Sequence, residues 1–423
     1  MMGDTRNTDE PRGSAALASS SATASSVEVP ATAAVPRQTI GQMLRNDLGF
    51  IPVLLTLIVV AVFFEVTTGG LFFEPRNISN LVVQISTIAI LSVGVTLVLL
   101  LGEIDLSLAA VSVLSGVVMG VLSERAHLPA LVAIIAALLS GALIGFVNGV
   151  IIAIIRVPSF IVTLAASIAY EGLLLYLLAG QSTLVLNDPF IVAISGSATS
   201  YLPDIYGVGL PTLVLLIYVG SLVWNHIKRR QAGLRTVTIA QLVTQVVITV
   251  VLVEGAVVLF ESYLGVPYAT AILIGLILLV WIMLTKTALG RHIYAVGGNA
   301  EAARRAGINV TGIRLLVFTL CSTLAAVGGI VAASHANSVA SQISSTLLLQ
   351  AIAAAVIGGV SLFGGRGSVW SILLGALIIG SLENGLDLKS QGTEVKDMIE
   401  GVVLALAVIV DALVRRAQAR SGR

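Results

Sequence analysis

The sequence predicts an all-α fold: a polytopic transmembrane helical bundle of about 10–12 spans, with one or two broken or re-entrant segments. Of its 423 residues, 57% are hydrophobic and only 11% are charged, whereas a soluble domain carries roughly 25% charged residues. Too few charged side chains remain to cover a water-facing surface, so most of the chain must face lipid. The 41 glycines agree with this, because glycine is more frequent in membrane helices than in soluble ones.

The first residues of the chain differ in composition from the rest. Residues 1–36 are rich in Ser, Ala and Thr and lack the apolar run of roughly 7–15 residues that a secretory signal needs. We therefore expect a disordered cytoplasmic tail over 1–45, with the first helix acting as an uncleaved signal. A transmembrane permease domain is expected over 46–415 and a basic C-terminal tail over 416–423.

Apolar stretches long enough to cross a bilayer recur throughout the membrane domain. A spanning helix needs about 20 mostly apolar residues. The short polar stretch after residue 101 leaves open whether the two segments around it are full spans or a broken, re-entrant pair. The expected spans are 49–68, 79–101, 106–123, 129–153, 158–179, 209–226, 237–260, 267–284, 313–334, 347–364, 368–385 and 397–414.

The basic residues predict the orientation of these spans. If the N-terminus is cytoplasmic, the inside segments hold 17 Lys and Arg residues and the outside segments hold 4, leaving aside Arg6 and Arg12 in the tail. Cytoplasmic loops of membrane proteins carry the excess of Lys and Arg. Both termini are therefore predicted to be cytoplasmic, and a re-entrant pair would not change this result.

Glycines at four-residue spacing mark helix faces that can pack closely. Gly141, Gly145 and Gly149 lie on one face of the span 129–153, and Gly116 and Gly120 repeat the spacing one span earlier. Small residues let the backbones of membrane helices approach each other. We favour packing inside one subunit, and the alternative is a seam between two subunits.

The longest basic inside segment, residues 285–312, is expected to hold a short capped helix. The two glycines at 297–298 suggest a flexible turn, Asn299 is a good N-cap, and residues 300–306 favour helix. A glycine after the helix and arginines in its last turn suit its C-terminus. So short a helix gains little without a partner, so we expect a docking element rather than a solvated linking loop. Its residues are Gly298, Asn299, Glu301, Ala302, Arg304, Arg305 and Gly307.

Polar side chains inside apolar stretches are expensive in a bilayer and usually face the bundle interior or an aqueous path. Glu103 and Asp105 fall in a polar break like those of discontinuous transporter helices, where they either hold a gate or form an ordinary cytoplasmic turn. Glu171 stands well inside a span, and for it a buried hydrogen-bonding role and a substrate contact are both open. The candidate pathway or gate residues are Glu103, Asp105, Ser107, Asn148, Glu171, Glu383 and Asn384.

No pattern in the sequence indicates catalysis. The GxxxxGK[ST] pattern of ATP-binding loops and the HExxH and GxSxG patterns of hydrolases are absent. A tight inside hairpin explains the glycines of 358–367, and Cys321 is expected to be a packed small side chain. We therefore expect neither an enzyme nor a metal site, and any ATP must be hydrolysed by another subunit.

Four stretches carry a resemblance to a known family. They are LLGEIDLSLAAVSVLSG (100–116), VPSFIVTLA (157–165), LGRHIYAVGGNAEAARRAGINVTGIR (289–314) and AIAAAVIGGVSLFGGRGSVWSILLGALIIGSLENGLDL (351–388). Together they resemble the ribose/xylose-type permeases of bacterial ABC importers, and the similarity covers nearly all of residues 50–415. The extra apolar segment 237–260 resembles the D-xylose permease branch. The chain departs from the family's usual residues at Glu103, Ala109 and Gln350.

The resemblance implies transport of a monosaccharide, D-xylose or a similar pentose, across the bacterial inner membrane. It implies a homodimer of permease subunits, a separate ATP-binding subunit that holds ATP and Mg²⁺, and an extracytoplasmic sugar-binding protein. The helix near 299–304 would then be the coupling helix that docks on the ATPase. Alternatives are a proton-coupled secondary transporter using Asp105, Glu171 or Glu383, an ABC permease for nucleosides or branched-chain amino acids, and a non-transporting scaffold. A net charge of +1 argues against a nucleic-acid partner.

Overall fold

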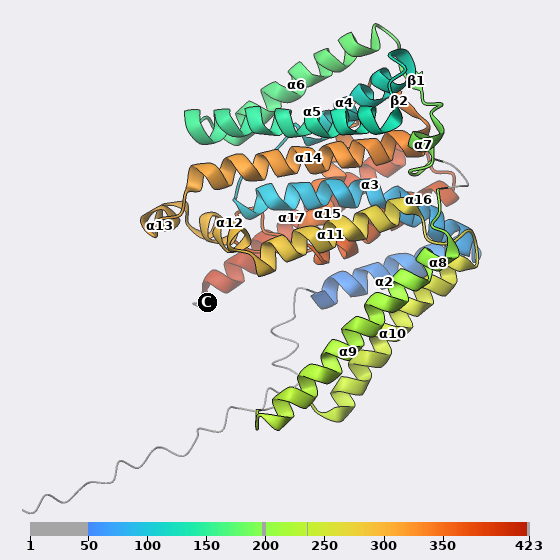
Figure 1. Ribbon diagram of the computed structural model, residues 1–423, viewed down its shortest axis with the longest axis vertical. Coiled ribbons are helices and arrows are strands. Elements are labelled where there is room, and N and C mark those ends of the chain that lie inside the picture. The colour runs from blue at the N-terminus through green and yellow to red at the C-terminus, as the bar shows by residue number, and fades with distance from the viewer. Residues whose placement is uncertain (1–49, 197–199, 235, 421–423) are drawn as a thin grey trace, which may run out of the picture. The chain divides into compact units, whose positions relative to one another are not determined.

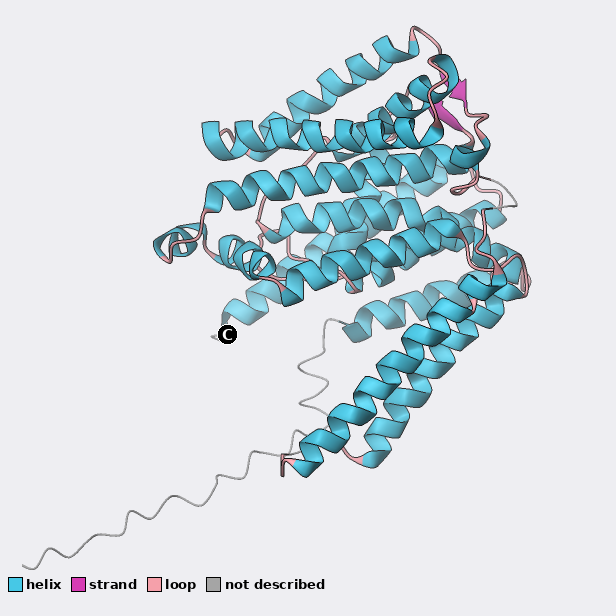
Figure 2. Cartoon of the chain, viewed as in Figure 1, coloured by secondary structure: helices cyan, strands magenta, loops and turns pink. Residues whose placement is uncertain are grey.

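The computed structural model describes residues 50–196, 200–234 and 236–420, and these residues are mostly helical (Figures 1 and 2). The predicted tail over 1–45 and the last three residues of the predicted C-terminal tail lie outside this part of the chain. The prediction of an all-α fold is confirmed for the bulk of the described residues. Its exception is an antiparallel pair of three-residue strands, β1 (Thr183–Val185) and β2 (Ser338–Ala340).

Every predicted span contains a helix. Within 50–420, apart from residues 197–199 and 235, 9 helical stretches are long and apolar enough to cross a membrane, and α2 and α15 contain shorter apolar helices. The long helices are α2 (Phe50–Thr67), α3 (Pro75–Leu100), α4 (Leu108–Gly120), α5 (Ala130–Val150), α6 (Ser159–Leu178), α9 (Gly209–Gln231), α10 (Ile239–Glu261), α11 (Tyr268–Lys286), α14 (Val310–Ala336), α15 (Ser345–Ile357), α16 (Ser371–Leu388) and α17 (Thr393–Arg420).

Helices α3, α14 and α5 pack side by side through the middle of the bundle (Figure 1). In α3, 89% of the most apolar window is buried inside the chain. A Cβ added at Gly141 would lie 2.7 Å from the carbonyl oxygen of Ser322, and one at Gly145 would lie 2.5 Å from that of Phe318. The glycine stripe of α5 therefore brings its backbone against α14, which confirms packing inside one subunit for these glycines.

The extra apolar segment forms α10, which pairs with α9 as a hairpin. Thr212 Oγ1 on α9 donates to Glu254 Oε1 on α10 at 3.0 Å. In the most apolar 18 residues of the helical stretch that includes α9, only 11% are buried, and in those of α10 only 6% are buried. Side chains this apolar and this exposed are suited to a lipid environment.

Two expectations about glycine-rich segments were wrong in detail. Gly297 and Gly298 do not form a turn, because they are the last residues of α12 (Ala288–Gly298), and α13 (Ala300–Arg305) follows directly. The predicted span 347–364 holds only the 13-residue helix α15. Gly358 and Gly359 end it, the latter with φ +89°, and a loop continues to α16.

Short elements and loops gather at the two ends of the bundle. The π-helical turn η2 (Ile151–Ile155), α12 and α13 lie at one end, named here the α13 end. The strands β1 and β2 and the short helix α7 (Pro189–Val192) lie at the opposite end (Figure 1). The predicted polar break, residues 101–107, is non-helical and lies at the α13 end, where α3 finishes.

Candidate functional site

The polar break separates α3 from α4, and side chains of α6 bond part of its backbone. The amide of Ile104 donates to Ser159 Oγ at 3.3 Å, and the amide of Leu106 donates to Thr163 Oγ1 at 3.0 Å. The two hydroxyls are four residues apart on α6 and thus lie on one face. Non-helical backbone at membrane depth is tolerated where neighbouring groups satisfy it. Here α6 supplies those groups.

A hydrogen-bonded chain, named here the Asp105 network, starts inside this break. Asp105, which is 5% exposed, accepts bonds from the amide and hydroxyl of Ser107 at 2.9 and 2.6 Å. The Ser107 hydroxyl accepts from Asn148 Nδ2 at 3.3 Å, and Asn148 Oδ1 accepts from the Tyr170 hydroxyl at 2.9 Å. On the other side of the carboxylate, Cys321 Sγ lies 3.8 Å from Oδ2. The network joins the break to α5, α6 and α14.

The side chains around Asp105 are oriented toward its carboxylate. Ser107 is the N-cap residue of α4, yet its side chain makes no capping bond: its hydroxyl donates to Asp105 and accepts from Asn148 Nδ2 instead of from a backbone amide of α4. Every donor along the chain points toward the carboxylate, an arrangement in which successive bonds strengthen one another.

Beside the break, three segments meet at what we name the glycine junction: Gly102, Gly297, Gly364 and Gly365. The amide of Gly365 donates to the Leu100 carbonyl at 2.9 Å. A Cβ at Gly297 would lie 1.7 Å from that same carbonyl oxygen, and one at Gly364 would lie 2.7 Å from the carbonyl oxygen of Gly297. Three of the stretches that carry the family resemblance therefore touch through bare backbone, where no larger residue fits without a shift.

The predicted short helix is present as α13, and its capping is confirmed. The Asn299 side chain accepts from the Ala302 amide at 2.9 Å, and Gly307 follows with φ +84°. Glu301 forms ion pairs at 3.0 and 3.4 Å with the two arginines of the last turn. These side chains are exposed, so α13 presents a compact charged surface at its end of the bundle.

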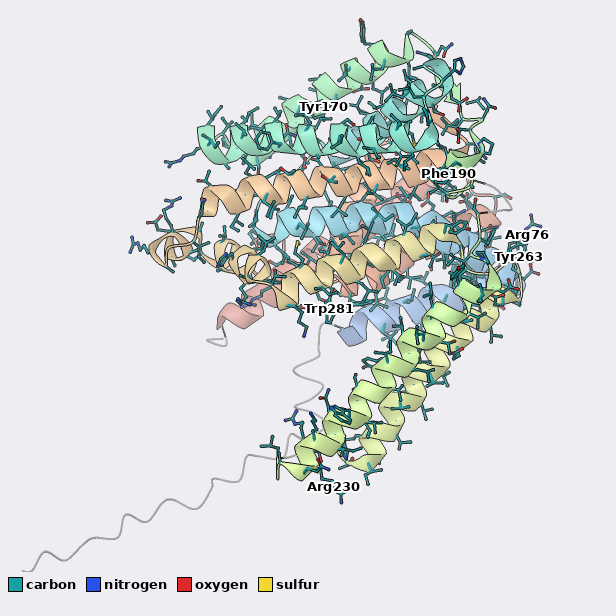
Figure 3. The ribbon with its side chains drawn as sticks, in the orientation of Figure 1. Arg76, Tyr170, Phe190, Arg230, Tyr263 and Trp281 are labelled. Carbon is teal, nitrogen blue, oxygen red and sulfur yellow. The ribbon has the colours of Figure 1, made fainter. Side chains whose placement is uncertain are left out.

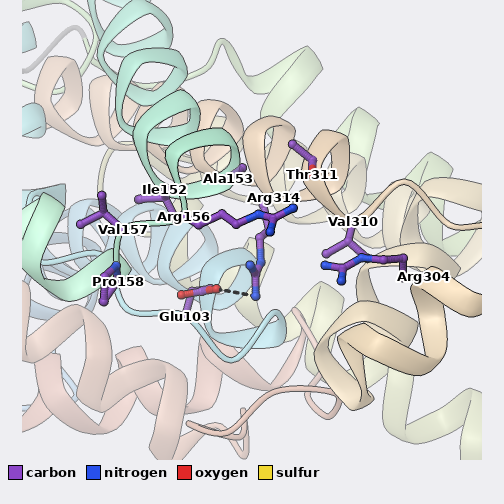
Figure 4. Close-up of a pocket in the computed structure, with 10 residues that line it drawn as sticks. All are labelled: Glu103, Ile152, Ala153, Arg156, Val157, Pro158, Arg304, Val310, Thr311 and Arg314. Atoms are coloured by element: carbon purple, nitrogen blue, oxygen red, sulfur yellow. Dashed lines mark ion pairs between the residues drawn. The ribbon is translucent and has the colours of Figure 1, made fainter.

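A pocket joins the two sets of predicted residues. Glu103 from the polar break pairs with Arg314 from the first turns of α14 at 3.0 Å. Arg304 of α13 and Arg156 line the same space, named here the basic pocket (Figure 4). Arg156 and Arg314 were missing from the predicted site. The one sequence feature that could have pointed to them is their position in basic segments predicted to be cytoplasmic.

The remaining candidates lie elsewhere. Glu171 follows Tyr170 of the Asp105 network on α6, but its side chain is exposed and is not part of the network. Asn384 accepts from Asn77 Nδ2 at 2.9 Å and donates to Gln84 Oε1 at 3.4 Å, near the other end of α3, with Glu383 beside it in α16. The carboxyls of Asp105, Glu171 and Glu383, considered above as proton carriers, therefore lie in different parts of the molecule. Of the candidate residues, those at the α13 end are the ones that come together around one site.

Comparison with known proteins identifies the family. Residues 77–408 match the family described as "Branched-chain amino acid transport system / permease component". The xylose transport system permease protein XylH of Escherichia coli K12 is 38% identical over 85% of this chain and 91% of its own. The ribose import permease protein RbsC of the same organism is 34% identical over 80% and 87%. The fructose import permease protein FrcC of Rhizobium meliloti is 30% identical over 90% and 91%.

No solved structure matches the chain. The family match covers the polar break, the basic pocket, α13 and the glycine junction, and the relatives are matched over most of their own length. The chain therefore belongs to this family of transport-system permease components, as a multi-pass membrane subunit.

Proposed function

We propose that this chain is the membrane-spanning subunit of an ABC importer that carries a monosaccharide, D-xylose or a similar pentose, across the bacterial inner membrane. The three relatives above carry sugars in their names, and the xylose permease is more similar to this chain than the ribose and fructose permeases are. The chain is the transport component, and ATP and Mg²⁺ are held by a partner ATPase.

We place the α13 end in the cytoplasm, and with it both termini. The support is the charge distribution: Arg156 is far in sequence from Arg304 and Arg314, yet all three line one pocket at this end. Positive charge gathers on the cytoplasmic side of membrane proteins. The permease domain is then 46–415, with 285–312 as its cytoplasmic coupling loop and with tails over 1–45 and 416–423.

The coupling helix is α13, and its contact with the ATPase is the step that drives transport. The supporting observation is the basic pocket, in which Arg304 of α13 lies beside the Glu103–Arg314 pair. Movement of α13 would act on α14 through Arg314, and on the polar break through Glu103. The Asp105 network connects that break to α5 and α6, so the gate and the docking element form one mechanical unit.

A second copy of the chain completes the permease as a homodimer. An extracytoplasmic sugar-binding protein delivers its sugar at the end that carries β1 and β2. The membrane pathway itself opens by alternating access between the two ends. Weak binding along this pathway suits the assembly, because a soluble partner provides the recognition.

The test is a double substitution on α13, Glu301→Ala with Arg304→Ala, in vesicles that also contain the ATPase and the binding protein. We expect xylose uptake per ATP hydrolysed to fall roughly tenfold or more, as for the loss of central charged groups from a docking contact. The permease should remain in the membrane, because both side chains are exposed.

A matched control is Arg229→Ala with Arg230→Ala, a pair of exposed charges near the end of α9 (Figure 3). This variant should transport normally. Normal uptake by the α13 variant would refute its assignment as the coupling helix. Uptake that persists without any ATPase would refute the ABC importer itself.

A further inference from the structure

The basic pocket holds more positive charge than the proposed coupling contacts account for. It is a cavity of about 220 Å³ between the polar break, the end of α5 and the start of α14. Figure 4 shows the guanidinium groups of Arg156 and Arg304 reaching toward Arg314 from opposite sides. Ile152 and Val310 contribute apolar side chains to the same lining.

Charge is unbalanced in this cavity. Its lining holds three arginines and one carboxylate, Glu103, which is already paired with Arg314. Arg304 is paired outside the cavity with Glu301. Among the described residues, Arg156 has no ion-pair partner, and the buried Nε of Arg314 has no hydrogen-bond partner. Like charges converge only at a cost unless an anion lies between them.

The backbone of Arg156 adopts an unusual conformation. It has φ +66° and ends the π-helical turn η2, a conformation that residues other than glycine rarely adopt. The chain then enters Val157–Pro158, where the residue before proline is restricted to extended conformations. Arg156 is exposed, and its side chain extends from the end of η2 into the space that Arg304 and Arg314 also line (Figure 4).

We propose that the basic pocket binds a phosphate group, carried either by an anionic lipid headgroup of the cytoplasmic leaflet or by inorganic phosphate. Guanidinium groups match phosphate oxygens in bidentate geometry. Inorganic phosphate offers more acceptor oxygens than a carboxylate does, and the phosphodiester of a lipid headgroup offers two non-bridging oxygens, so either can accept from more than one arginine. Basic pockets between membrane helices on the cytoplasmic side favour lipid phosphates, and the lipid source rests on the proposed orientation.

The test compares the wild-type full chain with Arg156→Gln, which removes a charge but leaves the Glu103–Arg314 pair and α13 intact. A second variant, Arg156→Glu, places a carboxylate of the protein itself beside the other two arginines, where it should take the place of the bound anion. The control is Arg230→Gln, the same substitution near the end of α9. Thermal unfolding confirms that each variant is folded before binding is measured.

One arm measures retention of phosphatidylglycerol against phosphatidylcholine by native mass spectrometry. The other measures the affinity of inorganic phosphate at fixed ionic strength in phosphatidylcholine nanodiscs. We expect Arg156→Gln to lower the affinity for the bound probe about tenfold, as for the loss of one charged hydrogen-bonding group. Arg156→Glu should abolish binding. Arg230→Gln should bind as the wild type does.

Preferential retention of phosphatidylglycerol identifies the lipid as the source, and phosphate affinity without lipid retention identifies the free ion. Equal effects of Arg156→Gln and Arg230→Gln would overturn the proposal. A wild-type protein that binds neither probe would also overturn it. If Arg156→Gln weakened association with the ATPase in that case, the occupant of the pocket would be a carboxylate of the partner protein.

Discussion

Asn148 occupies the middle of the Asp105 network and uses both ends of its amide. It accepts from Tyr170 and donates to Ser107, and it is 1% exposed. Replacing it with an apolar side chain would break two hydrogen bonds, one of them to the buried Ser107, whereas removing the Tyr170 hydroxyl breaks one bond at the half-buried edge of the network. The two changes should therefore differ in their effect on stability.

We predict that Asn148→Leu lowers the free energy of unfolding by about 1–3 kcal/mol, and that Tyr170→Phe lowers it by about 0.5–1.5 kcal/mol. Thermal unfolding in one detergent measures both. Tyr176→Phe is the control, since Tyr176 lies on the same helix and is 80% exposed. Equal shifts for the two tyrosine variants would contradict the hydrogen bond to Asn148.

The sequence predicted part of this network and could not predict the rest. Asp105, Ser107 and Asn148 stood out because polar side chains are rare in apolar stretches. Tyr170 and Cys321 gave no such signal, since tyrosine and cysteine are common in membrane helices for reasons of packing. Their partners lie 22 and 216 residues away, and only the packing of α5, α6 and α14 brings them together.

At the scale of elements, hydropathy located the helices within a few residues, as for 237–260 and the observed Ile239–Glu261. Hydropathy and local propensity failed where a glycine is needed because its lack of a side chain lets two backbones touch. Local propensity assigns Gly297 and Gly298 to a turn, yet they end a helix, because α12 must approach the Leu100 carbonyl. A long-range contact of that kind has no signature in a local window.

The glycine junction gives a matched pair of substitutions. Gly297→Ala would place a Cβ 1.7 Å from a backbone oxygen, so α12 must move, and we predict a loss of about 1–3 kcal/mol of stability. Gly298→Ala meets nothing within 4 Å and should stay within about 1 kcal/mol of the native protein.

Both glycine variants would be compared by thermal unfolding and by sugar uptake with the ATPase present. Because α13 follows α12 directly, Gly297→Ala should also reduce coupling. If the two alanine variants had the same stability, close approach at the junction would not be the reason for Gly297.

At the scale of the whole molecule, the predicted site residues separate into three groups. One surrounds the polar break at the α13 end, one links Asn384 to the start of α3 near the opposite end, and Glu171 stands alone on α6. Among the candidate pathway or gate carboxyls, Glu171 is the one with an exposed side chain. Its helix is otherwise suited to lipid, because the exposed neighbours of Glu171 include Ile168, Leu173 and Leu175. A charge at the bilayer centre costs about 2.5–3.5 kcal/mol even on insertion scales, so this face of α6 requires a cover other than lipid.

A second copy of the chain provides that cover in the proposed homodimer, which leads to a crosslinking prediction. Gly172 is next to Glu171, and a Cβ there would meet nothing within 4 Å. The sequence contains one cysteine, Cys321, and it is buried, so Gly172→Cys introduces a single accessible thiol. Oxidation in membranes should give a disulfide-linked dimer that persists when the protein is diluted with excess lipid.

Gly220→Cys on α9 is the matched control, because that position is equally open and lies on an exposed apolar helix. Its crosslinking should arise only from collisions and should fall as lipid is added. Restoring a neutral surface with Glu171→Leu should weaken the Gly172→Cys crosslink, since the need to cover the carboxyl is removed. If both cysteine variants responded alike to dilution, α6 would face lipid and Glu171 would have to be neutralised within one subunit.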